Sequence, residues 1–296
     1  MMDRHYSGFV SIIGSPNAGK STLMNALVGQ KVSIVSERAQ TTRNRIMGVL
    51  TKQSYQIVFL DTPGVTKPKN RLGEYMLKVA YESLNEVEAV LFIVDGIRGI
   101  AEKDELLIEK LRTAKSPVIA VINKNDAASA ADMEAIRNRL AEEKFLYDVI
   151  SVSAKMGDGL VRLEQLLKAL LPEGPQYFPQ DMVTDMPERI VCSEFIREKA
   201  LKLLKQEIPH GIGVGVDKME LREDGMYDIW ATIFCERDGH KGIIIGKSGT
   251  TLKRIGSDAR KDIEWLLGTR VNLQLWVKVK EDWRNSISVM RELGYE

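Results

Sequence analysis

Short apolar runs alternate with longer segments of helical periodicity between residues 8 and 171. Near-continuous apolar strands separated by helices are typical of βαβ units, in which helices cover a mostly parallel sheet. The expected strands are Phe9–Ile13, Ile46–Leu50, Ile57–Leu60, Val90–Val94, Val118–Ile122 and Val149–Val152. The expected helices are Lys20–Val28, Arg71–Leu84, Lys103–Arg112, Ala131–Glu143 and Leu160–Leu171. The sequence therefore predicts an α/β fold with a doubly wound, mostly parallel sheet.

Prolines crowd into the stretch that follows. Four of the nine prolines, Pro172, Pro175, Pro179 and Pro187, lie within sixteen residues. Proline removes a backbone donor and restricts its neighbours, so such a stretch favours a linker over a helix or strand. We therefore divide the chain into a first domain over residues 1–172, a proline-rich linker over residues 173–187 and a second domain over residues 188–296.

The second domain has a different pattern. In order, its expected elements are a helix at 188–206, strands at 214–222 and 227–237, two helices around a glycine-rich turn ending near 267, a strand at 271–279 and a terminal helix at 281–293. Asp224-Gly225 between the first two strands is a good hairpin signal. This order belongs to an α+β domain. All four tryptophans of the chain lie here and are expected mainly in its core: Trp230, Trp265, Trp276 and Trp283.

The composition excludes several classes of protein. Lys and Arg total 42 against 41 Asp and Glu, a formal net charge of +1, which argues against a generally basic nucleic-acid binder. Two cysteines and three histidines without ligand-like spacing argue against a disulfide framework or a zinc enzyme. No apolar run approaches the roughly 18 residues that span a bilayer, and no signal peptide is evident. We therefore expect a cytoplasmic protein.

A phosphate-binding motif follows the first expected strand and opens a helix. Residues 14–21 fit the pattern G-x-x-x-x-G-K-[ST], and a strand before it and a helix after it are the context that supports such a match. Glycines let successive backbone N–H groups point at phosphate oxygens, Lys20 would reach the β- and γ-phosphates, and Ser21 would bind Mg²⁺. The residues expected around the phosphates are Gly14, Ser15, Pro16, Asn17, Ala18, Gly19, Lys20, Ser21 and Thr22.

A second motif selects the base. Asn123-Lys124-Asn125-Asp126 directly follows the strand at Val118–Ile122. A carboxylate at Asp126 accepts hydrogen bonds from N1–H and the exocyclic amine of guanine, whereas adenine would leave it unpaired. Ser153-Ala154-Lys155, after the last expected strand, suits a loop behind the guanine. The sequence therefore predicts GTP and GDP as ligands.

Two further segments complete a nucleotide switch. Asp61-Thr62-Pro63-Gly64 ends a strand, so Asp61 can hold Mg²⁺ through a water and the Gly64 N–H can sense the γ-phosphate. A threonine of Gln40-Thr41-Thr42-Arg43 can complete the Mg²⁺ shell while the γ-phosphate is present, and its release after hydrolysis would be the switch. Val65 stands where Ras-like enzymes place a water-orienting glutamine, which predicts slow intrinsic hydrolysis.

These five motifs, in this order and spacing, resemble the translation-factor-related bacterial GTPases of the Era/MnmE group. By that resemblance Thr42 is the Mg²⁺ ligand of the two threonines, and Lys20, Thr42 and Gly64 serve catalysis. Asn17 resembles the asparagine that supports K⁺-stimulated turnover in this group. The alternative, that Asn17 only stabilises the loop, remains open.

The second domain contains a G-x-x-G loop between two expected helices. Gly246-Lys247-Ser248-Gly249 would let a nucleic-acid backbone approach closely while Lys247 offsets phosphate charge, which is the arrangement of a KH domain. The element order matches the bacterial, type II variant. Residues 237–261 carry seven basic and two acidic side chains, a local +5. The expected RNA-binding residues are Ile244, Gly246, Lys247, Ser248, Gly249, Lys253 and Arg254.

Taken whole, the organisation resembles the Era family of bacterial ribosome-assembly GTPases. The resemblance implies binding to small-subunit ribosomal RNA near its 3′ end, assistance in maturation of the small ribosomal subunit and peripheral association with the inner face of the cell membrane. It implies no DNA partner and a monomer. The residues alone leave two alternatives open: a non-catalytic RNA-binding scaffold that holds nucleotide, and a P-loop kinase or ATPase.

Overall fold

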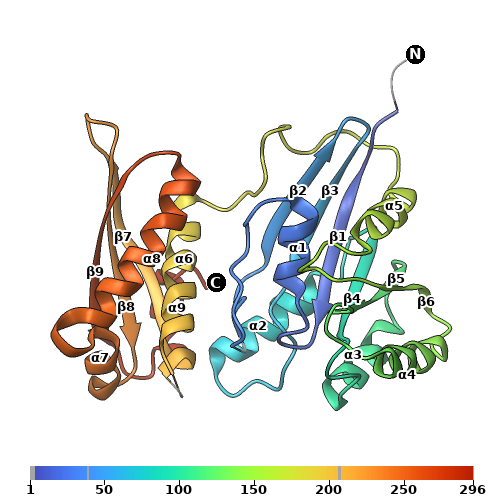
Figure 1. Cartoon of the computed structure of the whole chain (residues 1–296), viewed down its shortest axis with the longest axis horizontal. Coiled ribbons are helices and arrows are strands. Elements are labelled where there is room, and N and C mark those ends of the chain that lie inside the picture. Colours follow the sequence, from blue (N-terminus) through green and yellow to red (C-terminus); the bar gives the residue numbers. More distant parts are fainter. Residues whose placement is uncertain (1–3, 39, 206–207, 296) are drawn as a thin grey trace. The chain divides into compact units, whose positions relative to one another are not determined.

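The computed structural model describes residues 4–38, 40–205 and 208–295. The chain divides into two compact units (Figure 1). Unit 1 comprises residues 1–33, 42–68 and 76–185, and unit 2 comprises residues 34–41, 69–75 and 186–296. Two short stretches from the first part of the chain therefore belong to the same compact unit as its C-terminal part.

In unit 1 the described residues form a six-stranded sheet in the order β2-β3-β1-β4-β5-β6. β2 pairs antiparallel with β3, and every other neighbouring pair is parallel. The strands are β1 Tyr6–Gly14, β2 Ile46–Lys52, β3 Tyr55–Asp61, β4 Ala89–Asp95, β5 Val118–Asn123 and β6 Leu146–Ser151. The helices of this unit are α1 Lys20–Val28, α3 Glu102–Leu111, α4 Ala130–Ala141 and α5 Leu160–Leu170. Helix α2, Arg71–Glu82, begins in unit 2 and continues in unit 1 from Met76.

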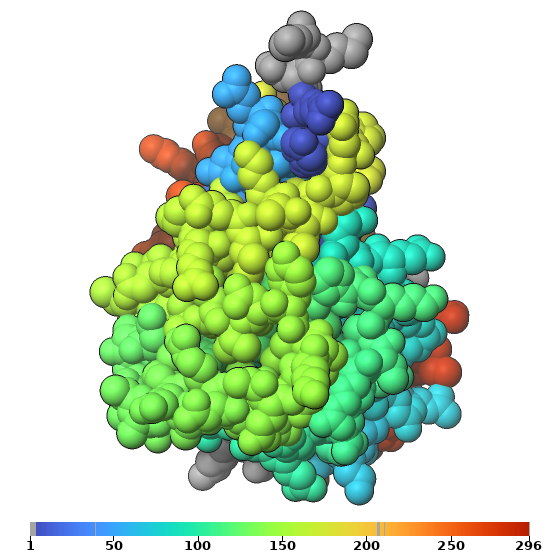
Figure 2. All heavy atoms as spheres, turned by 90° about the vertical axis from the view of Figure 1, so that its right-hand side faces the viewer, coloured from blue at the N-terminus to red at the C-terminus, as the bar shows by residue number. Residues whose placement is uncertain are grey.

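Helices cover both faces of this sheet. Apolar side chains of α2, α3 and α4 form one core cluster with alternate residues of the strands, including Met47 and Val49 of β2. Gly48, between them, points the other way and lies against Met24 and Val28 of α1. The predicted doubly wound, mostly parallel sheet is confirmed. Figure 2 shows the face formed by the later part of this unit, with green and yellow-green atoms in front.

The last strand of unit 1 starts earlier than the sequence pattern predicts. β6 begins at Leu146, three residues before the expected start at Val149. Because β6 is an edge strand, Leu146, Tyr147 and Asp148 are partly or fully exposed and carry no continuous apolar signal. Edge strands are commonly half-solvated, and apolar periodicity alone misses such residues.

The proline-rich stretch is irregular but packed. All of residues 172–187 are described, and apart from one isolated bridge between Tyr6 and Glu173 they form neither helix nor strand. Gly174 N donates to His5 O at 3.0 Å, and Val49 N of β2 donates to Val183 O at 2.9 Å. Residues 172–185 of this stretch therefore belong to unit 1.

In unit 2 the described residues form a three-stranded sheet in the order β7-β8-β9. β7 and β8 form an antiparallel hairpin, and β9 pairs parallel with β8. The strands are β7 Gly213–Leu221, β8 Tyr227–Cys235 and β9 Val271–Val279. The helices are α6 Glu188–Leu203, α7 Asp238–Ile245, α8 Thr250–Leu267 and α9 Ile287–Glu292. The predicted α+β order is confirmed, and apolar residues of α6 and α8 pack on the sheet.

Three expectations for unit 2 need correction or lie outside the described residues. The predicted terminal helix at 281–293 is wrong in extent, because Asp282 has a left-handed φ of 48° and a 3₁₀ turn precedes the short α9. Trp283 is fully buried, but Trp265 and Trp276 are 60% and 44% exposed, so these two are not core residues. The expected end of the first helix, Gln206, lies outside the described residues. No helix among the described residues is long and apolar enough to cross a membrane.

Candidate functional site

The loop between β1 and α1 is shaped by glycine. Gly19 has a φ of 97°, and a Cβ there would lie 2.2 Å from Nδ2 of Asn123. At Gly14, a Cβ would lie 2.5 Å from the carbonyl oxygen of Ile93 in β4. Positive φ and absent space both require glycine, so the backbone curls tightly into the start of α1. Asn17 also has a left-handed φ of 68° in this turn.

Asn123, at the end of β5, joins three of the predicted loops. Its Nδ2 donates to Ala18 O at 2.9 Å. Its Oδ1 accepts from Lys124 N at 2.8 Å and from Ala154 N at 3.0 Å. The side chain is 2% exposed, so these bonds are shielded from water. The structure therefore brings the phosphate loop, the base-selecting motif and the loop at Ser153–Lys155 together around one amide.

Lys20 is held inside the phosphate loop. Its Nζ donates to Gly14 O and Ser15 O, both at 3.0 Å, and the residue is 6% exposed. Burial lowers the pKa of Lys20 to about 8, although the negative charge of Asp61 opposes this. A phosphate beside the ammonium would favour its charged form. The loop thus presents a desolvated cation to an incoming anion.

A cluster of oxygens, which we call the Asp61 cluster, consists of Ser21, Ser33, Thr42 and Asp61. Oδ2 of Asp61 accepts from Ser21 Oγ at 2.6 Å, from Ser33 Oγ at 2.9 Å and from Thr42 Oγ1 at 3.3 Å. The hydroxyls of Ser21 and Thr42 are 2.9 Å apart. Burial raises the pKa of Asp61, and the hydrogen bonds oppose that shift.

The Asp61 cluster fits Mg²⁺. Hydroxyl and carboxylate oxygens are ligands that this hard cation prefers. Oδ1 of Asp61 is buried and has no hydrogen-bond partner among the described residues, which leaves a lone pair for another group. Of the four, sequence analysis predicted Ser21, Thr42 and Asp61 but missed Ser33, because a lone serine in a loop carries no local signal.

Gly64 lies against the phosphate loop. A Cβ at Gly64 would lie 2.9 Å from the backbone N and Cα of Pro16. Val65 N donates to Gly14 O at 3.3 Å, while the Val65 side chain is 7% exposed and belongs to the core. Thr62 Oγ1 donates to Ile12 O at 2.8 Å and so supports the turn. The position after Gly64 thus carries a core side chain that cannot orient water.

Polar side chains of neighbouring segments contact the residues that are predicted to select the base. Asp126 is exposed, and its Oδ1 accepts from Ser153 Oγ at 2.7 Å. Lys124 has a left-handed φ of 68°, and its Nζ donates to Asp95 Oδ2 at 2.6 Å. The register pairs Asp95 with Asn123 at the ends of neighbouring parallel strands. Asp95 is the second residue missed, although a carboxylate ending an apolar strand is a recognisable signal. Asn125 is partly buried, and Lys155 is exposed.

The G-x-x-G loop of unit 2 joins α7 to α8. Gly246 and Gly249 have φ values of 74° and 77°, and Ser248 between them has a φ of 51°. A Cβ at Gly246 would lie 2.2 Å from Thr251 Oγ1, whereas one at Gly249 would meet nothing within 4 Å. Lys247 and Ser248 are exposed, as are Lys253 and Arg254 on α8. Arg254 lies 3.9 Å from Asp258. The loop therefore presents backbone and positive charge to solvent.

One residue predicted to contact RNA, Ile244, is buried and is not accessible to a ligand. Ile244 is fully buried in the core of unit 2, so its side chain is not available to a base. Ile243 is 53% exposed, because successive residues of a helix point to different sides. Ile243, and not Ile244, is therefore the candidate for an apolar contact with RNA beside this loop.

Comparisons with known proteins agree with this geometry. Residues 9–124 match a family described as 50S ribosome-binding GTPase, and residues 207–284 match the KH domain family. The chain is 52% identical to GTPase Era of Alkaliphilus oremlandii over 98% of this chain and 99% of that protein. It is 50% identical to GTPase Era of Clostridioides difficile, covering 98% of each.

Solved structures agree with this relationship. The crystal structure of Aquifex aeolicus Era bound to GDP·AlF₄⁻ has a TM-score of 0.92 and 40% identity, over 98% of this chain and 99% of that one. Era in complex with MgGDPNP and nucleotides 1506–1542 of 16S ribosomal RNA has a TM-score of 0.93, the same identity and the same coverage. The chain belongs to the Era family of GTPases, enzymes that hydrolyse GTP with Mg²⁺ as cofactor.

Proposed function

We propose that this GTPase binds single-stranded RNA of the small ribosomal subunit near its 3′ end and assists maturation of that subunit. The observation that carries the proposal is the exposed G-x-x-G loop with Lys247 at its centre, on the same chain as a complete guanine-nucleotide site. A 40% identical Era was solved with a GTP analogue and a fragment of 16S ribosomal RNA, which supports the same partner class here.

Within the nucleotide site, catalysis rests on positioning and charge. The backbone N–H groups of the phosphate loop, except at Pro16, which has none, and the Lys20 ammonium would hold the β- and γ-phosphates. Ser21 and Thr42 would hold Mg²⁺ directly, and Asp61 would do so through water. The bound ion neutralises charge that develops on the phosphates. The Gly64 N–H would touch the γ-phosphate, and we nominate no side-chain base.

We propose that intrinsic hydrolysis is slow. Val65 cannot hydrogen-bond water and is part of the core, so another group must position the attacking water. Asn17 is a candidate to hold K⁺ beside the phosphates. Turnover measured in K⁺ and in Na⁺ buffers tests this role: faster hydrolysis in K⁺ supports it, and equal rates reject it.

We further propose a monomeric, cytoplasmic protein that has no DNA partner. The family resemblance adds peripheral membrane association as a prediction. Sedimentation of the purified full chain tests the monomeric state, and flotation with vesicles of anionic phospholipid tests membrane association. A dimer at micromolar concentration would contradict the first, and protein that stays unbound in the flotation assay would contradict the second.

Guanine selection is tested at the exposed carboxylate. Asp126→Asn replaces an acceptor by a donor at the position that faces N1 and C2 of the base, so it should weaken GTP and favour xanthosine triphosphate by at least about 100-fold in relative affinity. Isothermal titration with both nucleotides measures the change. A variant that keeps its preference for GTP would overturn the assignment of Asp126.

RNA binding is tested at the G-x-x-G loop. A Gly246→Asp, Gly249→Asp variant places two negative charges where a phosphate backbone would pass, so RNA affinity should fall while GTP affinity is unchanged. Gly225→Asp is the control: like Gly249→Asp, it adds a carboxylate at a positive-φ glycine with nothing within 4 Å of the added Cβ. The control site is remote from the G-x-x-G loop. Gly225 contacts Thr269 just after the C-terminal end of α8, whereas the loop precedes the N-terminal end, and this 18-residue helix is about 27 Å long.

The identity of the RNA needs a separate experiment. Crosslinking in cells followed by sequencing of the bound RNA should recover the 3′ end of small-subunit ribosomal RNA from the parent chain and not from the loop variant. Recovery of other RNAs at equal frequency would contradict the proposed partner but not the KH assignment. Undiminished RNA binding by the loop variant would contradict the KH assignment itself.

A further inference from the structure

The residues just before Thr42 belong to unit 2. Ile34 is fully buried and is part of the apolar core of that unit. Val35 N donates at 3.0 Å to Oε1 of Glu198, a residue of α6 that is 1% exposed. The described residues 34–38, 40 and 41, which we call the 34–41 segment, are therefore anchored to α6 at Ile34 by an apolar side chain and at Val35 by a backbone hydrogen bond.

An ion pair on α6, between the buried Arg197 and the partly buried Glu194, faces the end of the 34–41 segment. Arg197 is fully buried, and its Nε donates to Oε1 of Glu194 at 2.8 Å, while its Nη2 donates to the other carboxylate oxygen. Burial disfavours the guanidinium charge, but the Glu194 carboxylate outweighs this, and the pKa of Arg197 lies above its ordinary value. Two parallel hydrogen bonds fix the plane of the guanidinium.

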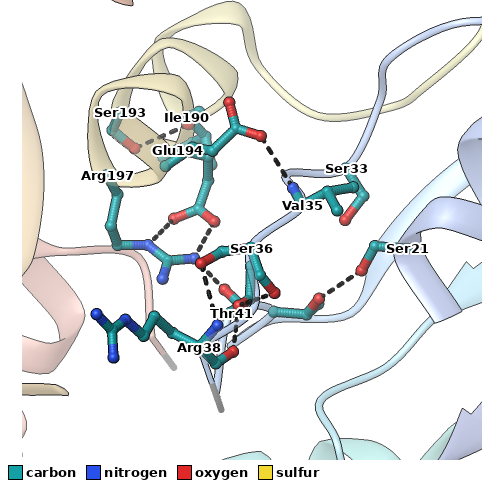
Figure 3. Close-up of polar contacts among 12 residues, drawn as sticks. Ser21, Ser33, Val35, Ser36, Arg38, Thr41, Ile190, Ser193, Glu194 and Arg197 are labelled. Atoms are coloured by element: carbon teal, nitrogen blue, oxygen red, sulfur yellow. Dashed lines mark hydrogen bonds and ion pairs between the residues drawn. The ribbon is translucent and has the colours of Figure 1, made fainter. Parts of the chain in front are cut away.

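The same Nη2 also donates to the backbone carbonyl of Thr41 (Figure 3). The Thr41 hydroxyl is used elsewhere, because it donates to Arg38 O at 2.7 Å. Both the side chain and the carbonyl of Thr41 are therefore held. A planar fork that meets a carboxylate and a carbonyl at once is a geometry that arginine offers and lysine does not.

The Thr41 carbonyl belongs to the peptide bond that joins Thr41 to Thr42. Because a peptide unit is planar, fixing this carbonyl also fixes the N–H and the Cα direction of Thr42. The Thr42 hydroxyl lies 2.9 Å from Ser21 Oγ and 3.3 Å from Asp61 Oδ2. One peptide plane thus separates the guanidinium of Arg197 from a hydroxyl of the Asp61 cluster.

We propose that the Glu194–Arg197 pair is a positioning device for GTP hydrolysis: it holds the Thr41–Thr42 peptide so that the Thr42 hydroxyl faces the metal position. The proposal rests on the proposed role of Thr42 as a Mg²⁺ ligand in the GTP state. Without the pair, the peptide can rotate, and Thr42 engages the metal less often. GDP binding does not need Thr42, so the effect should be confined to the GTP state.

The test uses the full chain with Arg197→Met, which removes the guanidinium but keeps an apolar stem of similar length. Single-turnover GTP hydrolysis is measured with the protein in excess over GTP and well above its Kd for GTP, over a series of Mg²⁺ concentrations. We expect a rate about 10-fold lower at limiting Mg²⁺, about 1.4 kcal/mol in activation free energy, and a higher half-maximal Mg²⁺ concentration. GDP affinity should change less than about twofold, because the GDP complex does not use the hydroxyl.

Arg189→Met is the matched control. Arg189 lies on the same helix, and its Nη2 donates to a backbone carbonyl, that of Val216 at 3.2 Å, outside the 34–41 segment. The control should keep the parental rate and Mg²⁺ dependence. If both variants lose activity equally, the loss reflects damage to α6, and the proposal is overturned.

A double-mutant cycle shows whether Arg197 acts through Thr42. In a Thr42→Ala background, Arg197→Met should cause no further loss, because the group being positioned is already absent. Additive losses would overturn the proposal. Unchanged hydrolysis by Thr42→Ala alone would remove the proposed role of Thr42 and the positioning role with it. An impaired Thr42→Ala with a normal Arg197→Met would remove only the positioning role.

A second variant keeps the test usable if Arg197→Met does not fold. Arg197→Lys keeps the charge next to Glu194 but lacks the fork, so it should fold and still show a rate at least about threefold lower at limiting Mg²⁺. Thermal unfolding of each variant is recorded in parallel. Parental rate and Mg²⁺ dependence in a folded Arg197→Lys protein would overturn the proposal.

Discussion

The phosphate loop of unit 1 and the G-x-x-G loop of unit 2 both use glycines at positive φ just before a helix, but their surroundings are opposite. Gly19 is followed by a lysine that is 6% exposed, and its α-carbon faces the amide of Asn123. Gly249 faces open space, and Lys247 beside it is exposed. The first loop is a preformed cradle for one compact anion. The second leaves its backbone free for a long ligand that approaches from solvent.

Glycine-to-alanine substitution in each loop should separate the two loops most clearly, and Gly19→Ala should have the largest effect of all. A Cβ there would clash with Asn123 Nδ2 and would have to tolerate a φ of 97°. Left-handed strain and overpacking together should cost roughly 2–5 kcal/mol, equivalent to a loss of about 30-fold to about 5,000-fold in GTP affinity. Fluorescent-nucleotide titration checks this. Parental affinity would mean that the cradle is less rigid than described.

Removal of the Asn123 side-chain amide, which joins the three loops, should have the next largest effect. Asn123→Ala leaves Ala18 O and two backbone N–H groups without this partner in a buried place. Each unsatisfied buried group costs about 1–3 kcal/mol, so GTP and GDP should weaken alike by roughly 30-fold or more. Calorimetric titration with both nucleotides checks the expectation. A loss seen for GTP only would show that Asn123 acts on the γ-phosphate rather than on the loops.

The buried Lys20 ammonium of the phosphate loop predicts that stability and nucleotide binding depend on pH. Burial lowers the pKa of Lys20 to about 8 in the nucleotide-free folded protein, against 10.5 in the unfolded chain. Below about pH 8 Lys20 is charged in both states, so the cost of burying the charge is fully present. Between about pH 8 and 10.5 only the unfolded chain keeps the proton, so the free energy of unfolding rises with pH. Because phosphate favours the charged form, GTP binding should take up a proton and weaken up to about tenfold per pH unit above 8. Titrations in buffers of different ionisation enthalpy measure this uptake, and Lys20→Met should abolish it.

The smallest effect is expected from Gly249→Ala. Nothing lies within 4 Å of the added Cβ, so only the φ of 77° opposes it, at about 1–2 kcal/mol. Thermal unfolding should show a modest loss of stability, RNA affinity should fall only a few-fold, and GTP affinity should not change. A loss as large as that of Gly19→Ala would erase the contrast between the two loops.

Much of the nucleotide site could be predicted from the sequence, because its motifs are local. Gly14–Ser21 and Asn123–Asp126 each sit at the end of an apolar strand, and parallel strands bring such ends to one edge of the sheet. Their tertiary supports could not be read in this way. Ser33 reaches Asp61 from 28 positions away, and Asp95 reaches Lys124 from 29. A single polar residue in a loop has no periodicity from which to infer its partner.

The fold was predictable where burial was continuous and less so where elements are half-exposed. Strand β6 and helix α9 differ from expectation because edge and terminal residues carry mixed polarity. Ile244 and Ile243 could not be told apart within an all-isoleucine run, since burial depends on which side of α7 meets the sheet. Helix α6 carries many charged side chains, yet Arg197 and Glu198 are buried because they hold residues of the 34–41 segment.

The division of the chain into units has a practical consequence for how the protein can be cut. The backbone passes from one unit to the other five times, after Ser33, Thr41, Pro68, Tyr75 and Asp185. The two units are thus interleaved and not strung in series. A fragment ending at the proline-rich stretch would carry Ile34 and the first turn of α2 without the neighbours that cover them. Excision of either half should therefore expose apolar side chains to water, so the isolated fragment should be less soluble and less stable than the full chain.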